Sequence, residues 1–306
     1  ISIILFTLGF TYIFLIDKAL YLNHFYLAIL YSFLMCFVPG HRYFSVDAYL
    51  RPKIKTTYVH FWPLFLLRTQ TEIVLLYAGL VKINYDWLMR AMPLKLWLAR
   101  GSSFDFLDYL FHLQYAPFIA SWGTVILHIF GAPLLLWKRT RIYVFIVYCL
   151  FHLVNNLTFK IGIFPAMTIA FTLIFFNPDW PMKFFQIPYK AKEKSLAAVK
   201  KSHKDFIICL ILLWSIVQIL FPLRSLLYPG NVLWTQQGHD FSWRMKLQDT
   251  VGNTVFVVTD LDSNETWDVP FRSRKIIHCR PDMILQFAHY LRDSWHEKGY
   301  KNVAVH

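Results

Sequence analysis

Long apolar runs separated by short polar segments make up most of the first 227 residues of the chain. A helix that crosses a bilayer needs roughly 20 apolar residues, with a range of about 17 to 25. Seven runs approach or meet that length, and together they predict an all-α polytopic membrane bundle of about seven spans over residues 1–227. The predicted spans are residues 1–16, 20–39, 61–83, 114–137, 141–157, 161–177 and 205–227.

The pattern changes in residues 228–306. Residues 255–259 and 266–269 are rich in β-branched side chains and flank a turn-forming stretch, which predicts a hairpin. Pro281 suits the first turn of a helix, and the apolar residues after it recur every fourth position, so one face of that helix is expected to pack on the strands. The tail is therefore predicted to be a small α+β unit outside the membrane. The recurring residues are Met283, Phe287, Leu291 and Trp295.

Residues 84–113 combine aromatic side chains with isolated charges. Such a mixture is typical of an amphipathic segment that lies in the membrane interface. We expect this segment on the same side of the membrane as the tail. Its aromatic residues include Trp87, Trp97, Phe104 and Phe106.

Composition supports a membrane protein. Hydrophobic residues make up 57% of the 306 residues and charged residues 16%, whereas a soluble domain has about 25% charged residues. The net charge of +13 lies entirely before residue 228, because the tail holds nine Lys/Arg and nine Asp/Glu. The excess cations lie between apolar runs, which indicates membrane topology and argues against a nucleic-acid partner.

The distribution of cations among the loops predicts orientation, because Lys and Arg resist translocation. Loops 40–60, 138–141 and 178–204 carry 14 Lys/Arg, and the alternate loops carry six. The first set is expected to be cytoplasmic. Residues 228–306 are then extracytoplasmic or lumenal, in a bacterial inner membrane or the endoplasmic reticulum.

Ionisable residues inside predicted spans are costly, so each suggests a functional site. At about 100° per residue, Arg68, Glu72, Gly79 and Lys82 fall within about 80° of one another on one helix face. Arg68 and Glu72 are expected to form a mutually neutralising ion pair, which in its simplest interpretation is structural. Lys82, near the outer end, is either an interfacial lysine with its amine in the headgroup region or a catalytic group.

Two other predicted spans favour the catalytic interpretation of Lys82. Asn23 and His24 begin the second span, and His152 and Asn155 lie near the end of the fifth. Under the predicted topology all these positions face one side of the membrane, where they would line a single cavity. Burial in an apolar cavity favours a neutral amine, which acts as a base. Each histidine taken alone is more often a core residue.

Other chemistries find little support in the sequence. It contains no HExxH, CxxC, P-loop or GxSxG motif, so we predict no metal site. Three of the four cysteines lie in predicted spans, leaving Cys279 outside, and one cysteine makes no internal disulfide.

The residues around Lys82 resemble a known family. The stretch from Arg68-Thr-Gln70 to Tyr77-Ala-Gly79-Leu-Val-Lys82-Ile-Asn-Tyr-Asp86-Trp87 resembles the membrane core of vitamin K-dependent gamma-glutamyl carboxylases and their horizontally transferred transmembrane-domain relatives. Further matches follow in order from about residue 20 to 250. They are Asn23-His24, Phe44-Ser-Val-Asp47, Phe151-His152 with Asn155, Ile161-Gly-Ile-Phe164, Pro178-Asp-Trp-Pro181 and Phe241-Ser-Trp243-Arg-Met245.

The resemblance implies an activity and roles for residues. Vitamin K hydroquinone, O2 and CO2 would be consumed as glutamyl residues of a protein or peptide are carboxylated and the quinol becomes its epoxide. Lys82 matches the second lysine of the family's Lys-Lys pair and would be the base that deprotonates the hydroquinone; Val81 replaces the first. His24 matches a histidine thought to assist at the glutamyl carbanion. The remaining implied quinone-pocket residues are Asn23, Arg68, Gln70, His152 and Asn155.

Several partners follow from this interpretation. Cations on the outer segment, namely Arg90, Lys95 and Arg100, are candidates for binding the substrate carboxylate. Membrane lipid would surround the bundle, and a quinone reductase would regenerate the hydroquinone.

The sequence also departs from the animal enzymes. Its tail is much shorter than their lumenal region, and Gln248 stands where they carry a histidine. An enzyme that oxidises quinol without carboxylating protein is therefore an alternative. A small-molecule transporter is a further alternative, although its substrate residues would be expected near the midplane between repeats.

Overall fold

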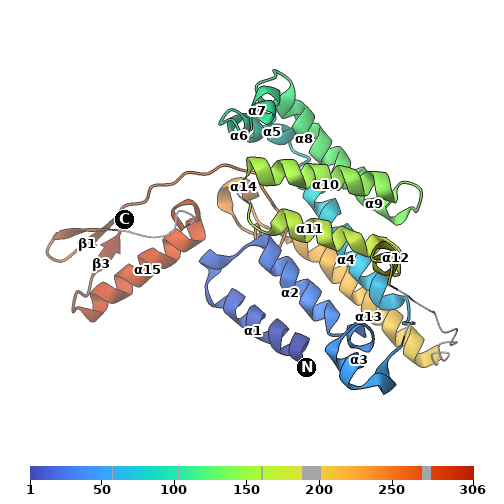
Figure 1. The fold of residues 1–306 in the computed structure, drawn as a ribbon. Coiled ribbons are helices and arrows are strands. Elements are labelled where there is room, and N and C mark those ends of the chain that lie inside the picture. The colour runs from blue at the N-terminus through green and yellow to red at the C-terminus, as the bar shows by residue number, and fades with distance from the viewer. Residues whose placement is uncertain (57, 103, 160, 188–200, 271–276) are drawn as a thin grey trace.

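The computed structural model describes residues 1–306 except 57, 103, 160, 188–200 and 271–276. Helices of the first 227 residues form the main body, and the C-terminal sheet with α15 lies beside it, joined by an extended segment (Figure 1).

The long helices of the main body are α1 (Ser2–Ile16), α2 (Asn23–Met35), α4 (Trp62–Leu80), α8 (Ala116–Ile126), α10 (Arg141–Thr158), α11 (Phe164–Thr172) and α13 (Lys201–Leu220). Shorter helices are α3 (Val46–Leu50), α9 (Ala132–Leu136), α12 (Trp180–Phe184), α14 (Val232–Thr235) and the π-helix η4 (Leu127–Gly131).

A helix lies over each of the seven predicted apolar runs, but the count of about seven spans is not confirmed. Within the described residues, three helices are long and apolar enough to cross a membrane: Ala116–Leu136, Arg141–Thr158 and Lys201–Leu227. A fourth crossing results if the bent pair Asn23–Met35 and Gly40–Leu50 is one span. The α1 helix is apolar but short, and Arg68 and Glu72 make α4 more polar.

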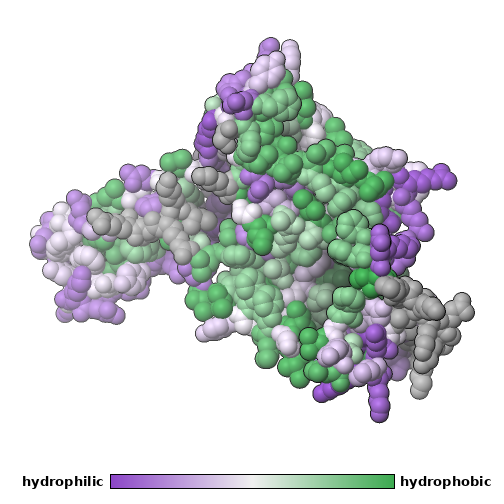
Figure 2. All heavy atoms as spheres, viewed as in Figure 1, coloured by the Kyte–Doolittle hydropathy of each residue, from purple (hydrophilic) through white to green (hydrophobic). Residues whose placement is uncertain are grey.

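The surface of the main body is apolar over broad areas. Figure 2 shows hydrophobic side chains over most of the helical bundle, with hydrophilic ones gathered at loops and on the C-terminal unit. Leu212, Leu213 and Ile216 on α13 are each more than half exposed. A surface of this kind is expected to face lipid.

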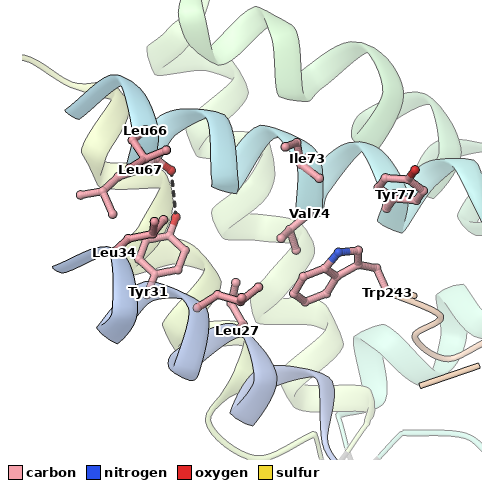
Figure 3. Close-up of a cluster of buried hydrophobic side chains, with 10 residues drawn as sticks. Leu27, Tyr31, Leu34, Leu66, Leu67, Ile73, Val74, Tyr77 and Trp243 are labelled. Carbon is pink, nitrogen blue, oxygen red and sulfur yellow. Dashed lines mark hydrogen bonds between the residues drawn. The ribbon is translucent and has the colours of Figure 1, made fainter. Parts of the chain in front are cut away.

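The core that positions the candidate site lies between α2 and α4. Leu27 and Tyr31 of α2 face Val74 of α4, and Trp243 from the distant C-terminal region lies among them, fully buried (Figure 3). The Tyr31 hydroxyl donates to the carbonyl of Leu67 at 3.3 Å. Burying an indole stabilises by a few kcal/mol on area grounds. Trp243 therefore anchors its segment of chain against two helices of the main body.

The described part of residues 84–113 contains three short helices. They are α5 (Tyr85–Leu88), α6 (Leu94–Leu98) and α7 (Asp105–Phe111). Trp87 and Trp97 are buried in a cluster with Val125 of α8, so these aromatic residues pack within the protein. The placement of the segment in the membrane interface stays a prediction.

The predicted α+β tail is present. Strands β1 (Phe256–Asp260) and β2 (Thr266–Val269) form the expected antiparallel hairpin, and α15 (Pro281–Glu297) begins at the expected proline. Phe287, Leu291 and Trp295 pack with the strands, as predicted. A third strand, β3 (Val303–Val305), was not predicted because it is only three residues long; it pairs with β1 and gives the order β2-β1-β3.

Candidate functional site

A cavity of about 590 Å³ lies where the ends of several helices of the main body meet. The start of α2 and the C-terminal ends of α4 and α10 contribute side chains to it. The structure brings five of the predicted site residues to this one cavity, as the sequence predicted. They are Asn23, His24, Lys82, His152 and Asn155, whose chemical roles stay predictions.

Lys82 lies just past the C-terminal end of α4, and only 6% of its surface is exposed. Its Nζ atom donates to the carbonyl oxygens of Ala78 at 2.8 Å and Met245 at 3.2 Å. The amine also lies over the Trp87 ring, 5.2 Å from its centroid. The side chain is thus held inside the protein.

The predicted histidines on α2 and α10 both lie near the ring of Phe164. The rings of His24 and His152 have centroids 6.2 and 6.4 Å from the Phe164 ring. His152 is 4% exposed, and its Nε2 atom has no hydrogen-bond partner among the described residues. The amide oxygen of Asn23 accepts from the Tyr21 hydroxyl at 3.1 Å. The cavity therefore holds a buried imidazole nitrogen that is free to meet a ligand.

A third histidine, His128, also lines the cavity and was missed by sequence reasoning. It lies in the π-helix η4, in a run that is otherwise apolar. The signal available in the sequence was Gly79, one turn before Lys82, which permits close helix packing. A Cβ atom at Gly79 would lie 2.9 Å from the His128 Cβ, so only glycine allows this approach.

Arg68 and Gln70 lie away from the cavity. Arg68 donates to the carbonyls of Ile174 at 2.9 Å and of Phe175 and Phe176 at 3.1 Å each. Gln70 is fully buried. Its amide nitrogen donates a hydrogen bond to the side-chain oxygen of Gln218, and its amide oxygen accepts one from the indole N–H of Trp214. Within the described part of the chain, neither lines the cavity, so both side chains contribute to helix packing there.

The predicted ion pair between Arg68 and Glu72 is wrong. The carbonyls of the 3-10 helix η5 (Leu173–Phe175), which follows α11, and of its C-cap Phe176 take the Arg68 donors, because a helix C-terminus leaves carbonyls without intrahelical partners. The Oε1 atom of Glu72 is buried and has no hydrogen-bond partner within the described residues.

The three cations predicted to bind substrate are engaged elsewhere. Arg90 pairs with Asp86 at 3.3 Å, the Lys95 amine lies 4.7 Å from the Phe118 ring centroid, and Arg100 pairs with Asp249. Among described residues, none of the three lines the cavity.

Two other cations, Arg244 and Lys246, line the cavity instead. Arg244 is half-buried and donates to the Ser225 hydroxyl at 3.2 Å. Lys246 is more exposed, and its amine lies 5.3 and 5.5 Å from the ring centroids of Trp97 and Phe159. The described lining contains no Asp or Glu, so its charge is positive wherever these groups are protonated.

The cavity also draws on two regions that comparisons with protein families identify separately. The family model described as the HTTM domain matches residues 1–180, which is more than half of the chain. The model described as the vitamin K-dependent gamma-carboxylase lumenal domain matches residues 203–306. The chain belongs to the vitamin K-dependent gamma-carboxylase family. This confirms the resemblance seen in the sequence, and no solved structure matches the chain.

Membership of the gamma-carboxylase family indicates an enzyme with vitamin K-dependent carboxylase-like function. It also indicates a membrane protein with a lumenal domain. In this gamma-carboxylase relative the cavity lies at the junction of the two matched regions, because Lys82 and the histidines come from the first and Arg244 to Lys246 from the second. Both regions are therefore needed to build the site.

Proposed function

We propose that this chain is an integral-membrane enzyme that couples oxygenation of vitamin K hydroquinone to γ-carboxylation of glutamyl residues. One hydroquinone, one O2, one CO2 and one glutamyl residue would give one epoxide, one water and one γ-carboxyglutamyl residue. The observation that carries the proposal is the buried Lys82 amine in a largely apolar cavity that also holds His24 and His152. The partners would be a glutamate-containing protein or peptide, membrane lipid and a quinone reductase.

The cavity fits a vitamin K hydroquinone. Its volume of about 590 Å³ lies in the range typical of small-molecule sites, about 300 to 1,000 Å³. Leu27, Val74, Leu75 and Phe151 supply apolar walls for an aromatic ring. Asn23, His152 and Asn155 supply polar groups that would hold the ring oxygens. When bound, the hydroquinone supplies the reducing electrons and the strong base that the carboxylation needs.

Lys82 is arranged to accept a proton. A neutral amine has two N–H groups and one lone pair, and the carbonyls of Ala78 and Met245 engage two donors. The lone pair is then left for a proton from a ligand hydroxyl. Burial favours the neutral amine, since charge in an apolar site is costly.

The glutamyl carboxylate would be recognised at the cavity opening. Lys246 both lines the cavity and is exposed, so it lies where cavity and solvent meet. Arg244 lines the cavity and also a second hollow of about 310 Å³ beside Asn84 and Asn231. Guanidinium and ammonium groups bind carboxylates through charge-assisted hydrogen bonds. We assign carboxylate recognition to these two residues in place of Arg90, Lys95 and Arg100.

His24 would serve the glutamyl half of the reaction. It lies at the start of α2, lines the cavity and is partly exposed, so a glutamyl side chain that enters the cavity would meet it. A hydrogen bond from its ring would stabilise negative charge that develops on the glutamyl side chain.

The direct test is an assay of the purified chain with reduced vitamin K, O2, labelled CO2 and a glutamate-rich peptide. Epoxide and peptide-bound label are measured separately, and the expected result is that both form and that omitting the quinol abolishes both. Epoxide without label on any glutamyl peptide would favour the alternative, a quinol-oxidising enzyme that does not carboxylate protein. No epoxide under any of these conditions would overturn the proposal.

A further inference from the structure

The π-helix η4 places His128 in the cavity beside Lys82. A π-helix widens the helix by one residue per turn and often occurs at functional sites. Here it faces Gly79 of α4, where the absence of a side chain lets the η4 backbone approach closely. His128 is 5% exposed, lines the cavity, and has rings of Tyr148 and Phe151 on its flanks, at 5.7 and 5.2 Å between centroids. Its position is therefore fixed on several sides.

The hydrogen bond that His128 makes determines its tautomer. The Nδ1 atom lies 2.8 Å from the Thr124 carbonyl oxygen, one turn earlier. A carbonyl oxygen only accepts hydrogen bonds, so Nδ1 carries the hydrogen. In a neutral ring the other nitrogen, Nε2, then has a lone pair and no hydrogen.

The surroundings of His128 favour the neutral ring. The titratable groups that line the cavity with it are Lys82, His24, Tyr31, His152, Arg244 and Lys246, and the described lining has no carboxylate to balance another positive charge. Charging an imidazole in such a place is unfavourable because of both desolvation and like-charge repulsion. His128 thus presents an acceptor to whatever occupies the cavity.

We propose that His128 is a specificity-determining residue that accepts a hydrogen bond from a ring hydroxyl, so that the cavity binds a hydroquinone in preference to the corresponding quinone. A hydroquinone hydroxyl donates to Nε2, whereas a quinone carbonyl would place its lone pairs against that of Nε2. The inference rests on the proposed function in taking a quinol as the ligand, but it concerns binding and needs no turnover.

The test is an anaerobic titration of the purified chain with 2-methyl-1,4-naphthoquinone and with its hydroquinone. The wild type is expected to bind the hydroquinone about tenfold more tightly, the size of effect of one hydrogen bond of about 1.4 kcal/mol. A tenfold preference raises the two-electron potential of the bound couple by about 30 mV relative to the free couple, which is an independent readout.

Variants at His128 distinguish the effect of its hydrogen-bond acceptor from the effect of its size. His128→Leu is expected to lose most of the preference while binding the quinone normally, which also shows that the variant is folded. His128→Gln is expected to recover part of the preference, because its amide oxygen accepts a hydrogen bond. His41→Leu removes an exposed histidine elsewhere and should leave both affinities unchanged.

The possible results are distinct. Equal affinities in the wild type, or an unchanged preference in His128→Leu, would overturn the role of His128 and leave the proposed function standing. A wild type that binds neither compound would overturn both.

Discussion

The Nζ atom of Lys82 lies 3.2 Å from the carbonyl oxygen of Met245, which is 163 residues further along the chain. Two residues before Met245, Trp243 is buried between α2 and α4 and holds this stretch in place. Trp243 and Lys246 both have positive φ angles, 55° and 53°, a conformation that bulky residues adopt only when surrounding contacts hold them there. The contact explains why the C-terminal region is part of the site: it supplies an acceptor that orients the candidate base.

Replacing Lys82 should stop epoxide formation. A general base typically contributes a factor of about 10² to 10⁴ in rate, so Lys82→Ala is expected to lower epoxide formation by at least that much. Lys82→Arg should fail as well, because the guanidinium stays protonated. Lys53→Ala, which changes an exposed lysine far from the cavity, is the matched control. Near-normal epoxide from Lys82→Ala, without added amine, would remove Lys82 from the mechanism.

The approach of η4 to α4 gives a second prediction. In Gly79→Ala the new methyl group would lie 2.9 Å from both the His128 Cβ and the Ile129 Cγ1, so the π-helix must move. Overpacking of this kind costs about 1 to 3 kcal/mol, which should appear as a lower melting temperature and weaker hydroquinone binding.

Gly123→Ala is the control for that substitution. Its Cβ would meet nothing within 4 Å, so stability should stay the same or rise slightly. If Gly79→Ala behaves like Gly123→Ala in both measurements, the close approach does not matter for the site.

The sequence predicted the parts of the site that carry a local signal. Lys82, His24 and His152 are polar residues in apolar runs, and their positions near the ends of those runs were enough to place them together. The hairpin and the apolar face of α15 were predicted because turn residues and a repeat of about four residues are also local patterns.

The features that the sequence did not predict depend on tertiary contacts. The mixed sequence of residues 241–246 gives no sign that Trp243 will be fully buried or that Arg244 and Lys246 will line the cavity. Arg68 was predicted to pair with Glu72 because they are four residues apart, but carbonyls at residues 174–176 satisfy it instead. Three carbonyls from a distant turn compete better than one carboxylate, and no local pattern encodes their position.

The attachment of the start of α15 to the segment around Asp240 should depend on pH. The Arg280 guanidinium donates two hydrogen bonds to the Asp240 carboxylate, at 2.9 and 2.8 Å, and both side chains are nearly buried. Burial alone would raise the pKa of Asp240, but the neighbouring His239 and Arg280 hold it well below its usual range. Because the pKa of Asp240 is lower in the folded state, the ion pair makes its full contribution to the stability of the folded protein above the unfolded pKa of about 3.9. That contribution is lost as the pH falls below this value towards the folded-state pKa.

Asp240→Asn tests this. Breaking a buried ion pair costs about 3 to 5 kcal/mol, so the variant should unfold at clearly lower denaturant concentration than the wild type at pH 7. The difference should shrink as the pH falls below about 4. Asp293→Asn, at an exposed pair with Arg292, should show almost no difference at either pH. A gap between wild type and Asp240→Asn that stays constant with pH would contradict the assignment.

The orientation of the chain is tested independently of activity. Single cysteines placed at Ser195 and Ser263, in a background without the four native cysteines, should react with membrane-impermeant reagents from opposite sides of the membrane. Ser195 lies outside the described residues, in the lysine-rich loop predicted to be cytoplasmic, and Ser263 lies in the turn between β1 and β2. Labelling of both from the same side would show that the predicted orientation is wrong.

Because Lys82 and His24 are assigned to different halves of the reaction, a variant at one of them should change the yield of epoxide and the yield of fixed CO2 by different amounts. If Lys82 starts quinol oxidation and His24 acts only on the glutamyl side chain, His24→Ala should reduce CO2 fixation much more than epoxide formation. Losing one hydrogen bond to a developing anion typically costs about 10² to 10³ in rate, so the ratio of label to epoxide should fall clearly. His24 is only partly buried and its ring contacts are to Phe25 and Phe164, so its removal should leave the fold largely intact. An equal fall in both yields would place His24 in the quinol site or in the fold, and the glutamyl half of the reaction would then need another group.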